Sequence, residues 1–245
     1  MSISAREFSG KELNRRIKAA GDYVYIDDCF GQRFIACGLQ GKKVEINGTP
    51  GNALGAYLDG AVIEVKGNAQ DATGDTMNDG KIIIHGNAGD ALGYSMRGGR
   101  IFVRGNAGYR TGIHMKEYKD KKPIIIVGGH AGSFLGEYLA GGIIVVLGLG
   151  VWKAPRGAEN DPVGNFTGTG MHGGKIFIRT DKELAALPAQ VTAEIAGKDE
   201  LGEIEPEVRE FASLFGMDAQ SLLGDKFYLL RPNAKNPYKQ HYTAY

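Results

Sequence analysis

GNAGDALGYSMRGGRIFVRG, residues 86–105, is one copy of a unit that recurs along most of this chain. Each regular unit begins with glycine, and the starting glycines are 19 residues apart: Gly48, Gly67, Gly86 and Gly105. After an insertion, the step from Gly129 to Gly148 again measures 19 residues, and imperfect copies begin near Cys29 and Asp161. A fixed period of about 20 residues is the signature of a solenoid, in which short coils stack on one another.

Three columns of apolar residues run through these units. The first, fifteen residues after each starting position and shifted in the interrupted unit, reads Val44, Ile63, Ile82, Ile101, Ile125, Ile144 and Ile176. The second, two residues further on, reads Ile46, Val65, Ile84, Val103, Val127, Val146 and Ile178. The third reads Leu39, Leu58, Met77, Met96, Met115, Leu139 and Met171. A spacing of two residues keeps side chains on one face of a strand, so these columns predict inward ladders of apolar side chains.

The glycines indicate which kind of coil the units form. Glycine recurs three and seven residues into the unit, as at Gly89 and Gly93. Such positions suit turns with positive φ or close backbone contact, and units this short and glycine-rich leave no room for a helix. The sequence therefore predicts an all-β fold, a single-stranded, right-handed parallel β-helix of about seven coils. Within it, Asn68, Asn87 and Asn106 are expected to stack as an amide ladder.

Composition narrows the class of protein. The 245 residues include 38 glycines, which is about twice the usual share. The formal net charge of +1 argues against a protein that binds nucleic acid. No apolar run reaches the ~18 residues that a membrane span needs, no secretory signal opens the chain, and two cysteines make no disulfide framework. We therefore expect a cytoplasmic protein with neither a membrane nor a nucleic acid as its partner.

The repeats divide the chain into three parts. Residues 1–21 form an amino-terminal cap, in which residues 9–21 are predicted to be a short helix. Residues 22–180 form the β-helix, entered through a strand at residues 23–27. Residues 181–245 form a helical extension with an aromatic tail. Its helices are predicted at residues 181–197, 206–216 and 218–223.

Two insertions interrupt the repeats, at residues 116–123 and 149–160. The second contains Trp152, the only tryptophan, and the tail over residues 227–245 contains four tyrosines. Long loops on a rigid scaffold often carry contacts, and aromatic side chains anchor interfaces. Since the glycine turns offer little to grip, we expect the Trp152 loop and the tail to contact partner subunits or a second copy. The alternatives are tolerated surface insertions and a tail that packs along the chain's own coils.

The sequence shows no self-sufficient active site. Nucleophile elbows, phosphate-binding loops and zinc-ligand spacings are absent, and the histidines fall in different columns. Cys29 and Cys37 have a spacing that fits neither a zinc site nor a redox pair, so we interpret them as structural or surface thiols. Asp71 and Asp90 share a column, but two carboxylates fall short of the ligands that calcium needs. We predict no catalytic, cofactor-binding or metal-binding residue in this chain.

The repeats resemble those of a known family. The segments GNAGDALGYSMRGGRIFVRGNAG and GGHAGSFLGEYLAGGIIVVLG are similar to the GXGXG domain, the carboxy-terminal β-helix of the glutamate synthase large (alpha) subunit. The resemblance covers about residues 22–180. The same repeats also resemble the C subunit of formylmethanofuran dehydrogenase, so the motif indicates the fold more firmly than the pathway.

The resemblance implies a role rather than catalytic residues. In glutamate synthase, other domains hydrolyse glutamine and transfer ammonia to 2-oxoglutarate on FMN, and the β-helix holds them together. This chain has no counterpart of the amidotransferase nucleophile, the FMN barrel or the iron–sulfur cysteines. The resemblance therefore implies a non-catalytic scaffold subunit, with amidotransferase and FMN-dependent synthase partners that carry the FMN and the iron–sulfur clusters.

Two alternatives to this role stay open. One is a scaffold subunit in formylmethanofuran dehydrogenase or in a related amidotransferase-linked pathway. The other, from a different class, is an independent β-helix enzyme that acts on carbohydrate. Separate amidotransferase and synthase chains encoded nearby favour the glutamate synthase reading, and molybdopterin or tungsten subunits favour the first alternative.

Overall fold

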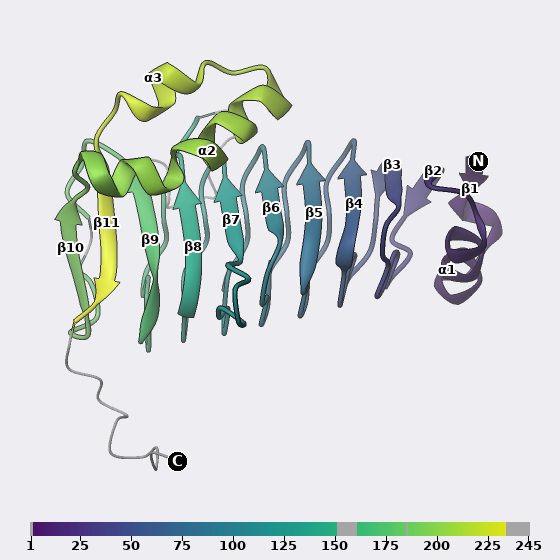
Figure 1. Cartoon of the computed structure of the whole chain (residues 1–245), viewed down its shortest axis with the longest axis horizontal. Helices are drawn as coiled ribbons and strands as arrows, with labels where there is room; N and C mark the ends of the chain where they lie inside the picture. The colour runs from purple at the N-terminus through teal and green to yellow at the C-terminus, as the bar shows by residue number, and fades with distance from the viewer. Residues whose placement is uncertain (1, 151–160, 185, 234–245) are drawn as a thin grey trace, which may run out of the picture.

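The chain is a right-handed parallel β-helix in a computed structural model that describes residues 2–150, 161–184 and 186–233. Each coil contributes one long strand, and these strands form one elongated sheet (Figure 1). The strands are β1 (Ser2–Ser4), β2 (Tyr23–Phe30), β3 (Lys43–Thr49), β4 (Asp59–Val65), β5 (Asp79–Ile84), β6 (Arg100–Val103), β7 (Ile124–Val127), β8 (Ala140–Val146), β9 (Gly173–Arg179), β10 (Val191–Ile195) and β11 (Phe227–Pro232). The helices are η1 (Ala5–Glu7), α1 (Gly10–Ala19), α2 (Lys198–Phe215) and α3 (Ala219–Leu223).

The predicted apolar ladders form the core of the solenoid. Neighbouring strands pair in the predicted register, as in Ile82 opposite Ile101 and Ile125 opposite Ile144. All three predicted columns are buried, and the members of the first column are fully inaccessible to solvent. Removing each of these side chains from water stabilises the fold by about 1.5–3 kcal/mol. The register predicted from the sequence is therefore confirmed.

The solenoid has one coil more than the repeats predict. Strands β2 to β9 are consecutive parallel neighbours in the sheet, which makes about eight coils rather than about seven. The additional coil is the one that ends in β2, the strand predicted at residues 23–27. Helix α1 precedes this strand in place of a glycine-rich turn, so the sequence of this coil shows no repeat.

The glycine seven residues into each unit is required for two reasons. Gly136 has a φ of +64°, in the left-handed region that residues with a Cβ disfavour. A Cβ at this position would also lie 2.6 Å from Cδ1 of Ile176, which belongs to the inward ladder. Gly74 and Gly93 combine the same backbone conformation with an isoleucine at the same close range. The glycine column therefore provides the space that the isoleucine column fills.

Side-chain amides tie successive turns together. The side-chain oxygen of Asn68 accepts a hydrogen bond from the backbone N–H of Asn87, and that of Asn87 accepts one from Asn106, each at 2.8 Å. The side-chain oxygen of Asn106 accepts from the N–H of His130 at the same distance. The predicted amide ladder is confirmed, with bonds that run from backbone to side chain.

Helix α1 covers the amino-terminal end of the solenoid, as predicted (Figure 1). Oγ of Ser9 accepts a hydrogen bond from the N–H of Glu12 at 3.3 Å and caps the first turn of the helix. Leu13 and Ile17 lie four residues apart on one face and are fully buried in the solenoid core. The short strand β1 pairs in parallel with β2 beside this helix.

The segment that follows β9 corrects two predictions. Residues 181–197 are not a helix, because residues 191–195 form the strand β10, whose branched side chains favour extended backbone. The aromatic tail is partly strand as well, since β11 inserts antiparallel between β9 and β10. The helix predicted at residues 218–223 is confirmed as α3. The Trp152 loop from residue 151 and the tail beyond residue 233 lie outside the described residues.

Helix α2 begins earlier than the predicted helix at residues 206–216. Pro206 suggests a first helical position, but the helix begins at Lys198. There the Glu200 carboxylate accepts a hydrogen bond from the N–H of Gly197 at 3.0 Å, which satisfies one of the free donors of the first turn. Pro206 lies inside the helix and opposite the carbonyl of Gly202, an exposed residue.

Helices α2 and α3 cover the outer face of the sheet over its carboxy-terminal half (Figure 1). The outward column on the strands is polar at Glu45 and Glu64 and becomes apolar from β5 onward. Its apolar members are Ile83, Phe102, Ile126, Val145, Phe177 and Leu229. They pack with Val208 and Phe211 of α2 in a second hydrophobic core. The short apolar runs at residues 124–127 and 143–147 are buried strand segments, as predicted, and both of their faces are covered.

Candidate functional site

A row of ion pairs joins α2 to the outer face of the sheet. Three glutamates spaced four and three residues apart lie on one face of the helix, and each binds a cation from a different strand. The pairs are Glu203–Lys175, Glu207–Arg100 and Glu210–Lys81. The spacing of the acids on α2 thus matches three strands of the sheet, β9, β6 and β5. This row fixes how the helix lies on the sheet.

The central pair contains the most buried of the three glutamates. Nε and Nη2 of Arg100 donate to the two carboxylate oxygens of Glu207 at 2.7 and 2.8 Å. Glu207 is buried, with 8% of its surface exposed. The hydrogen bond to Glu207 raises the pKa of Arg100, so the guanidinium stays charged at neutral pH. A forked pair of this kind gives a fixed orientation as well as energy.

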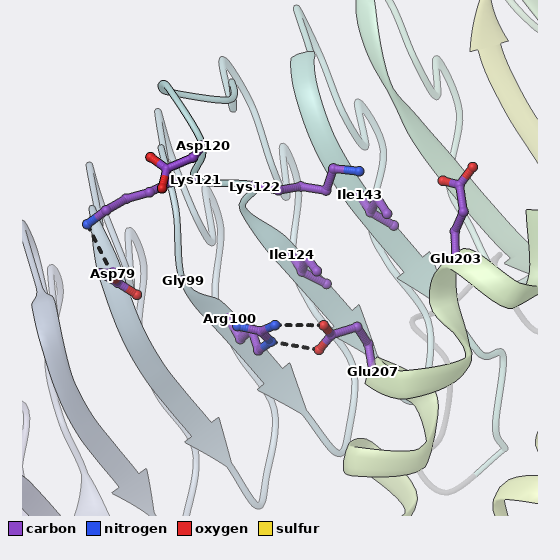
Figure 2. A pocket seen from close by; sticks show the side chains of 10 residues that line it. All are labelled: Asp79, Gly99, Arg100, Asp120, Lys121, Lys122, Ile124, Ile143, Glu203 and Glu207. Carbon is purple, nitrogen blue, oxygen red and sulfur yellow. Dashed lines mark hydrogen bonds and ion pairs between the residues drawn. The ribbon is translucent and has the colours of Figure 1, made fainter.

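A polar pocket of about 360 Å³ lies between this row and the first insertion (Figure 2). Ile124 and Ile143 contribute its apolar lining. Arg100, Glu203 and Glu207 line the side that faces α2. Asp79, Gly99 and the insertion residues Asp120, Lys121 and Lys122 line the opposite side.

Most charges around the pocket are already paired. Nζ of Lys121 lies 3.1 Å from Asp79, and this bond raises the pKa of Lys121. Burial opposes ionisation of Asp79, but hydrogen bonds from the N–H of Gly80 and from Lys121 lower its pKa. Among the described residues, Asp120 and Lys122 make no ion pair. In Figure 2 the Lys122 side chain extends from the insertion toward Ile143.

The pocket is lined mainly by charged side chains. Its lining contains no serine, threonine, cysteine, histidine or tyrosine, so it lacks a nucleophile beside a general base. Burial opposes ionisation of Asp79, but its hydrogen bonds lower its pKa and make it a poor proton donor at neutral pH. Over the part of the chain that the structure describes, no three His, Cys, Asp or Glu side chains are grouped as a metal site requires.

The turns opposite the sheet carry a row of aromatic side chains, here called the turn face. His114 stacks on Tyr138 with 5.1 Å between ring centroids, and Tyr94 meets His114 edge-on at 5.9 Å. Phe134 and Phe166 stack on each other with 5.0 Å between ring centroids, and Phe166 is 57% exposed. The turns are therefore not bare, contrary to the expectation from their glycines. Exposed apolar rows of this kind mark interaction surfaces.

Comparison with known proteins assigns the family. The sequence model described as GXGXG motif matches residues 13–233. The chain belongs to the GXGXG family. "Uncharacterized protein MJ1350" of Methanocaldococcus jannaschii is 41% identical to this GXGXG protein over an alignment of 253 residues. The alignment covers 98% of this chain and 95% of that protein.

A solved structure shares the fold of this GXGXG protein. It is the formyltransferase/hydrolase complex FhcABCD of Methylorubrum extorquens in complex with methylofuran. One of its chains superposes with a TM-score of 0.65 and 20% sequence identity over 85% of this chain and 72% of that chain. At this identity the likeness concerns the fold alone.

The aspartates and cysteines considered in the sequence have structural partners in this GXGXG protein. Oδ1 of Asp71 accepts from the N–H of Asp90 at 2.9 Å, and Oδ1 of Asp90 accepts from the N–H of Tyr109 at 2.8 Å. The two aspartates lie in one column, as predicted, and tie adjacent turns together. Burial raises the pKa of the Cys29 thiol to about 11, so it stays protonated at neutral pH. Neither Cys29 nor Cys37 forms a disulfide.

The histidines lie apart, as their columns predict. His85 lies 3.0 Å from the Glu64 carboxylate on the outer face, and Nδ1 of His130 lies 2.7 Å from the carbonyl oxygen of Asp161. His241 lies outside the described residues, as does Trp152. Among the described helices, none combines the length and apolar character that crossing a bilayer requires.

Two features of the molecular surface were not predicted from the sequence: the ion pairs of α2 and the aromatic row of the turn face. The three glutamates of α2 carry the spacing of one helix face, but their partners come from strands far away in the chain. The turn-face aromatics do have a sequence signal, because Phe134 and Phe166 occupy the same place in their units. His114 and Tyr138 likewise share a column. Side chains in one column stack when coils stack, so these columns predict contact between their members.

Proposed function

We propose that this chain is a non-catalytic scaffold subunit of a glutamate synthase-like complex, in which partner subunits transfer the glutamine amide to 2-oxoglutarate. The observation that carries the proposal is the match to the GXGXG family over residues 13–233. The repeats of that family resemble the glutamate synthase domain that joins catalytic domains without chemistry of its own. In this proposal FMN and iron–sulfur clusters belong to the partners, and the assembly is cytoplasmic.

The way the interior is filled supports a scaffold. Three apolar ladders occupy the inside of the coils from β2 to β9, and α2 and α3 close the outer face over β5 to β9. A small-molecule site needs a concave surface with convergent polar groups, and the ladders leave none inside the coils. Function therefore has to reside on the outer surfaces, where a rigid rod can hold other subunits at fixed distances.

The contact surfaces in this proposal are aromatic. The turn face offers Tyr138 and Phe166 on stacked coils. The Trp152 loop and the tail over residues 227–245, of which residues 234–245 follow β11, add further aromatic side chains. Aromatic side chains supply large contact areas at low entropic cost and dominate interface energies. The turn face adds a surface to the two predicted from the sequence.

Co-expression tests the scaffold role. We expect the chain to co-purify with separately encoded glutamine amidotransferase and FMN-dependent synthase chains, and glutamine-dependent glutamate formation to require all of them. The purified chain alone should neither hydrolyse glutamine nor bind FMN or NAD. Glutaminase activity that follows this chain through purification, and disappears when one of its residues is changed, overturns the proposal.

Surface variants test where the partners bind. Three changes are compared: the double change Tyr138→Ser with Phe166→Ser, the change Trp152→Ala, and deletion of residues 234–245. The matched control is Phe30→Ser, since Phe30 is 86% exposed but lies at the end of β2, away from the turn face. At least one of the three changes should release a partner while the control keeps it. Retention of every partner by all variants contradicts the assignment of these surfaces.

A second candidate is a scaffold of the formylmethanofuran dehydrogenase type or of a related amidotransferase-linked pathway. The fold likeness to a chain of the formyltransferase/hydrolase complex favours it. Native purification distinguishes the two candidates, because molybdopterin or tungsten subunits indicate the second. An independent carbohydrate enzyme is favoured less, since one carboxylate oxygen of both Asp71 and Asp90 is engaged by the neighbouring turn.

A further inference from the structure

The sheet ends at an open edge on its carboxy-terminal side. Its strand order finishes with β9, β11 and β10, and none of the described residues pairs with the outer side of β10 (Figure 1). Residues 192–195 of this strand are exposed, and Ile195 is 64% exposed. An unpaired edge presents a row of backbone donors and acceptors, which is a template for another strand.

The backbone bonds of β10 show which groups face the open side. In an antiparallel pair, residues that bond to the partner strand alternate with residues that face away from it. Ala196 donates its N–H to the carbonyl of Phe227 at 2.9 Å, and Gln190 accepts from the N–H of Asn233 at 2.8 Å. Every second residue between Gln190 and Ala196 follows the same pattern, so the backbone groups of Thr192 and Glu194 also face β11. The backbone groups of Val191, Ala193 and Ile195 therefore face outward.

The residues around Val191 agree with this assignment. Val191 lies opposite Pro232, which has no N–H to offer, so a bonded pair at this point is not required. The N–H of Val191 instead donates to the carbonyl of Pro188 at 2.9 Å. The open groups are thus the N–H and C=O of Ala193, the N–H and C=O of Ile195, and the C=O of Val191.

We propose that β10 pairs antiparallel with β10 of a second copy of this chain, centred on Ala193. This register forms four interchain hydrogen bonds: Ala193 N–H to the Ala193 carbonyl, and Ile195 N–H to the Val191 carbonyl, each in both directions. The Val191 N–H, which is bound to Pro188, is not needed. The two copies then share one continuous sheet across a two-fold axis.

The side chains are self-complementary in this register. Val191 lies opposite Ile195 of the second copy, so the most exposed apolar side chain of the strand gains an apolar neighbour. Thr192, whose hydroxyl donates to the Arg231 carbonyl of its own chain at 3.3 Å, lies opposite Glu194, so the register brings no like charges together. Glu194 also stays within its own ion pair with Arg231 at 3.2 Å.

The edge lacks several of the features that usually prevent such pairing. The sequence VTAEI contains no proline and no lysine, and β10 pairs with β11 without a bulge. At the opposite end of the solenoid, the edge strand β1 is only three residues long, and helix α1 lies beside it. A two-fold interface at one end only closes at two copies and does not propagate into a fibre.

Sedimentation of the full-length purified chain tests the proposal independently of the scaffold role. The chain should sediment as a dimer at micromolar concentration. Ala193→Pro removes two of the four interchain bonds and should weaken the dimer roughly tenfold or more. Proline is tolerated on an edge strand where its nitrogen faces solvent, so circular dichroism of this variant should match the parent.

Two substitutions of opposite charge at Thr192 should change the dimer affinity in opposite directions. Misfolding would weaken the dimer in both variants. Thr192→Glu places a carboxylate opposite Glu194 and should weaken the dimer severalfold, whereas Thr192→Lys places a cation there and should keep or strengthen it. A chain that is monomeric at all concentrations overturns the proposal. So does a dimer that is indifferent to all three substitutions. Loss of a different subunit on Ala193→Pro, with a monomeric parent, assigns the edge to that subunit and also overturns it.

Discussion

Replacing Gly136 by alanine tests whether the glycine column makes room for the isoleucine ladder. A Cβ at φ +64° costs roughly 1–2 kcal/mol for the left-handed backbone. The same Cβ would lie 2.6 Å from Cδ1 of Ile176, and overpacking a core costs about 1–3 kcal/mol more. We therefore expect the free energy of unfolding to fall by about 2–5 kcal/mol. The matched control is Gly41→Ala, since Gly41 has φ +60° with nothing within 4 Å, and it should lose only about 1–2 kcal/mol.

Urea unfolding followed by circular dichroism measures both losses. A second change, Ile176→Val, removes the Cδ1 methyl that the new Cβ would meet and costs about 0.5–1.5 kcal/mol alone. In Gly136→Ala the same change should relieve the clash, which gives a favourable coupling of about 1–2 kcal/mol in a double-mutant cycle. Equal losses for the two alanine variants, together with an additive cycle, refute the idea that steric fit selects glycine at this column.

Three further outcomes follow from the burial and charge of single side chains. Ile101→Asp places an unpaired charge in a fully buried ladder and should cost more than about 4 kcal/mol, so that a melting curve and circular dichroism like the parent's would contradict the register. Cys37, which is partly exposed, should react with iodoacetamide well before Cys29, because burial raises the pKa of Cys29 to about 11. Mass spectrometry of a time course shows the order of reaction, and denaturant should abolish the difference between the two thiols. Burial opposes ionisation of Glu64, yet hydrogen bonds, chiefly from Lys66, lower its pKa from 4.5 to about 2. The stability that Glu64 contributes is therefore complete above pH 4.5 and is lost as the pH falls toward 2. Glu64→Gln should flatten the stability curve in that window, and a curve that stays parallel to the parent's would count against the ion pairs.

The second hydrophobic core shows how far strand patterning extends. Strands that alternate between apolar and polar residues, such as β3 with Val44, Glu45 and Ile46, have one face in water. From β5 onward the alternation stops, and β7 is apolar at every position. A loss of alternation predicts that both faces are covered. It does not say by which segment, and the answer, α2, begins more than 70 residues after β7 ends.

The carboxy-terminal part shows the opposite case, in which local pattern gives the wrong element. Residues 181–197 contain alanines and apolar spacings that fit a helix, yet residues 191–195 are a strand. The reason is that β9 leaves an unpaired edge, and β11 and then β10 satisfy it. Pairing with that edge satisfies a row of backbone donors and acceptors, which outweighs a weak preference for helix.

The repeat by itself determined the β-helix, its register and the inward ladders. Each coil contacts chiefly its two neighbours, so a period in sequence becomes a column in space with no further information. Glycine in the turns, and the amide and carboxylate ladders beside them, follow from the same stacking. The tertiary structure alone decided the rest: which helix covers the outer face, which strand of the sheet binds each glutamate of α2, and where the sheet stays open. These contacts join segments without a common period, and their partners are chosen by shape and charge once the solenoid has formed.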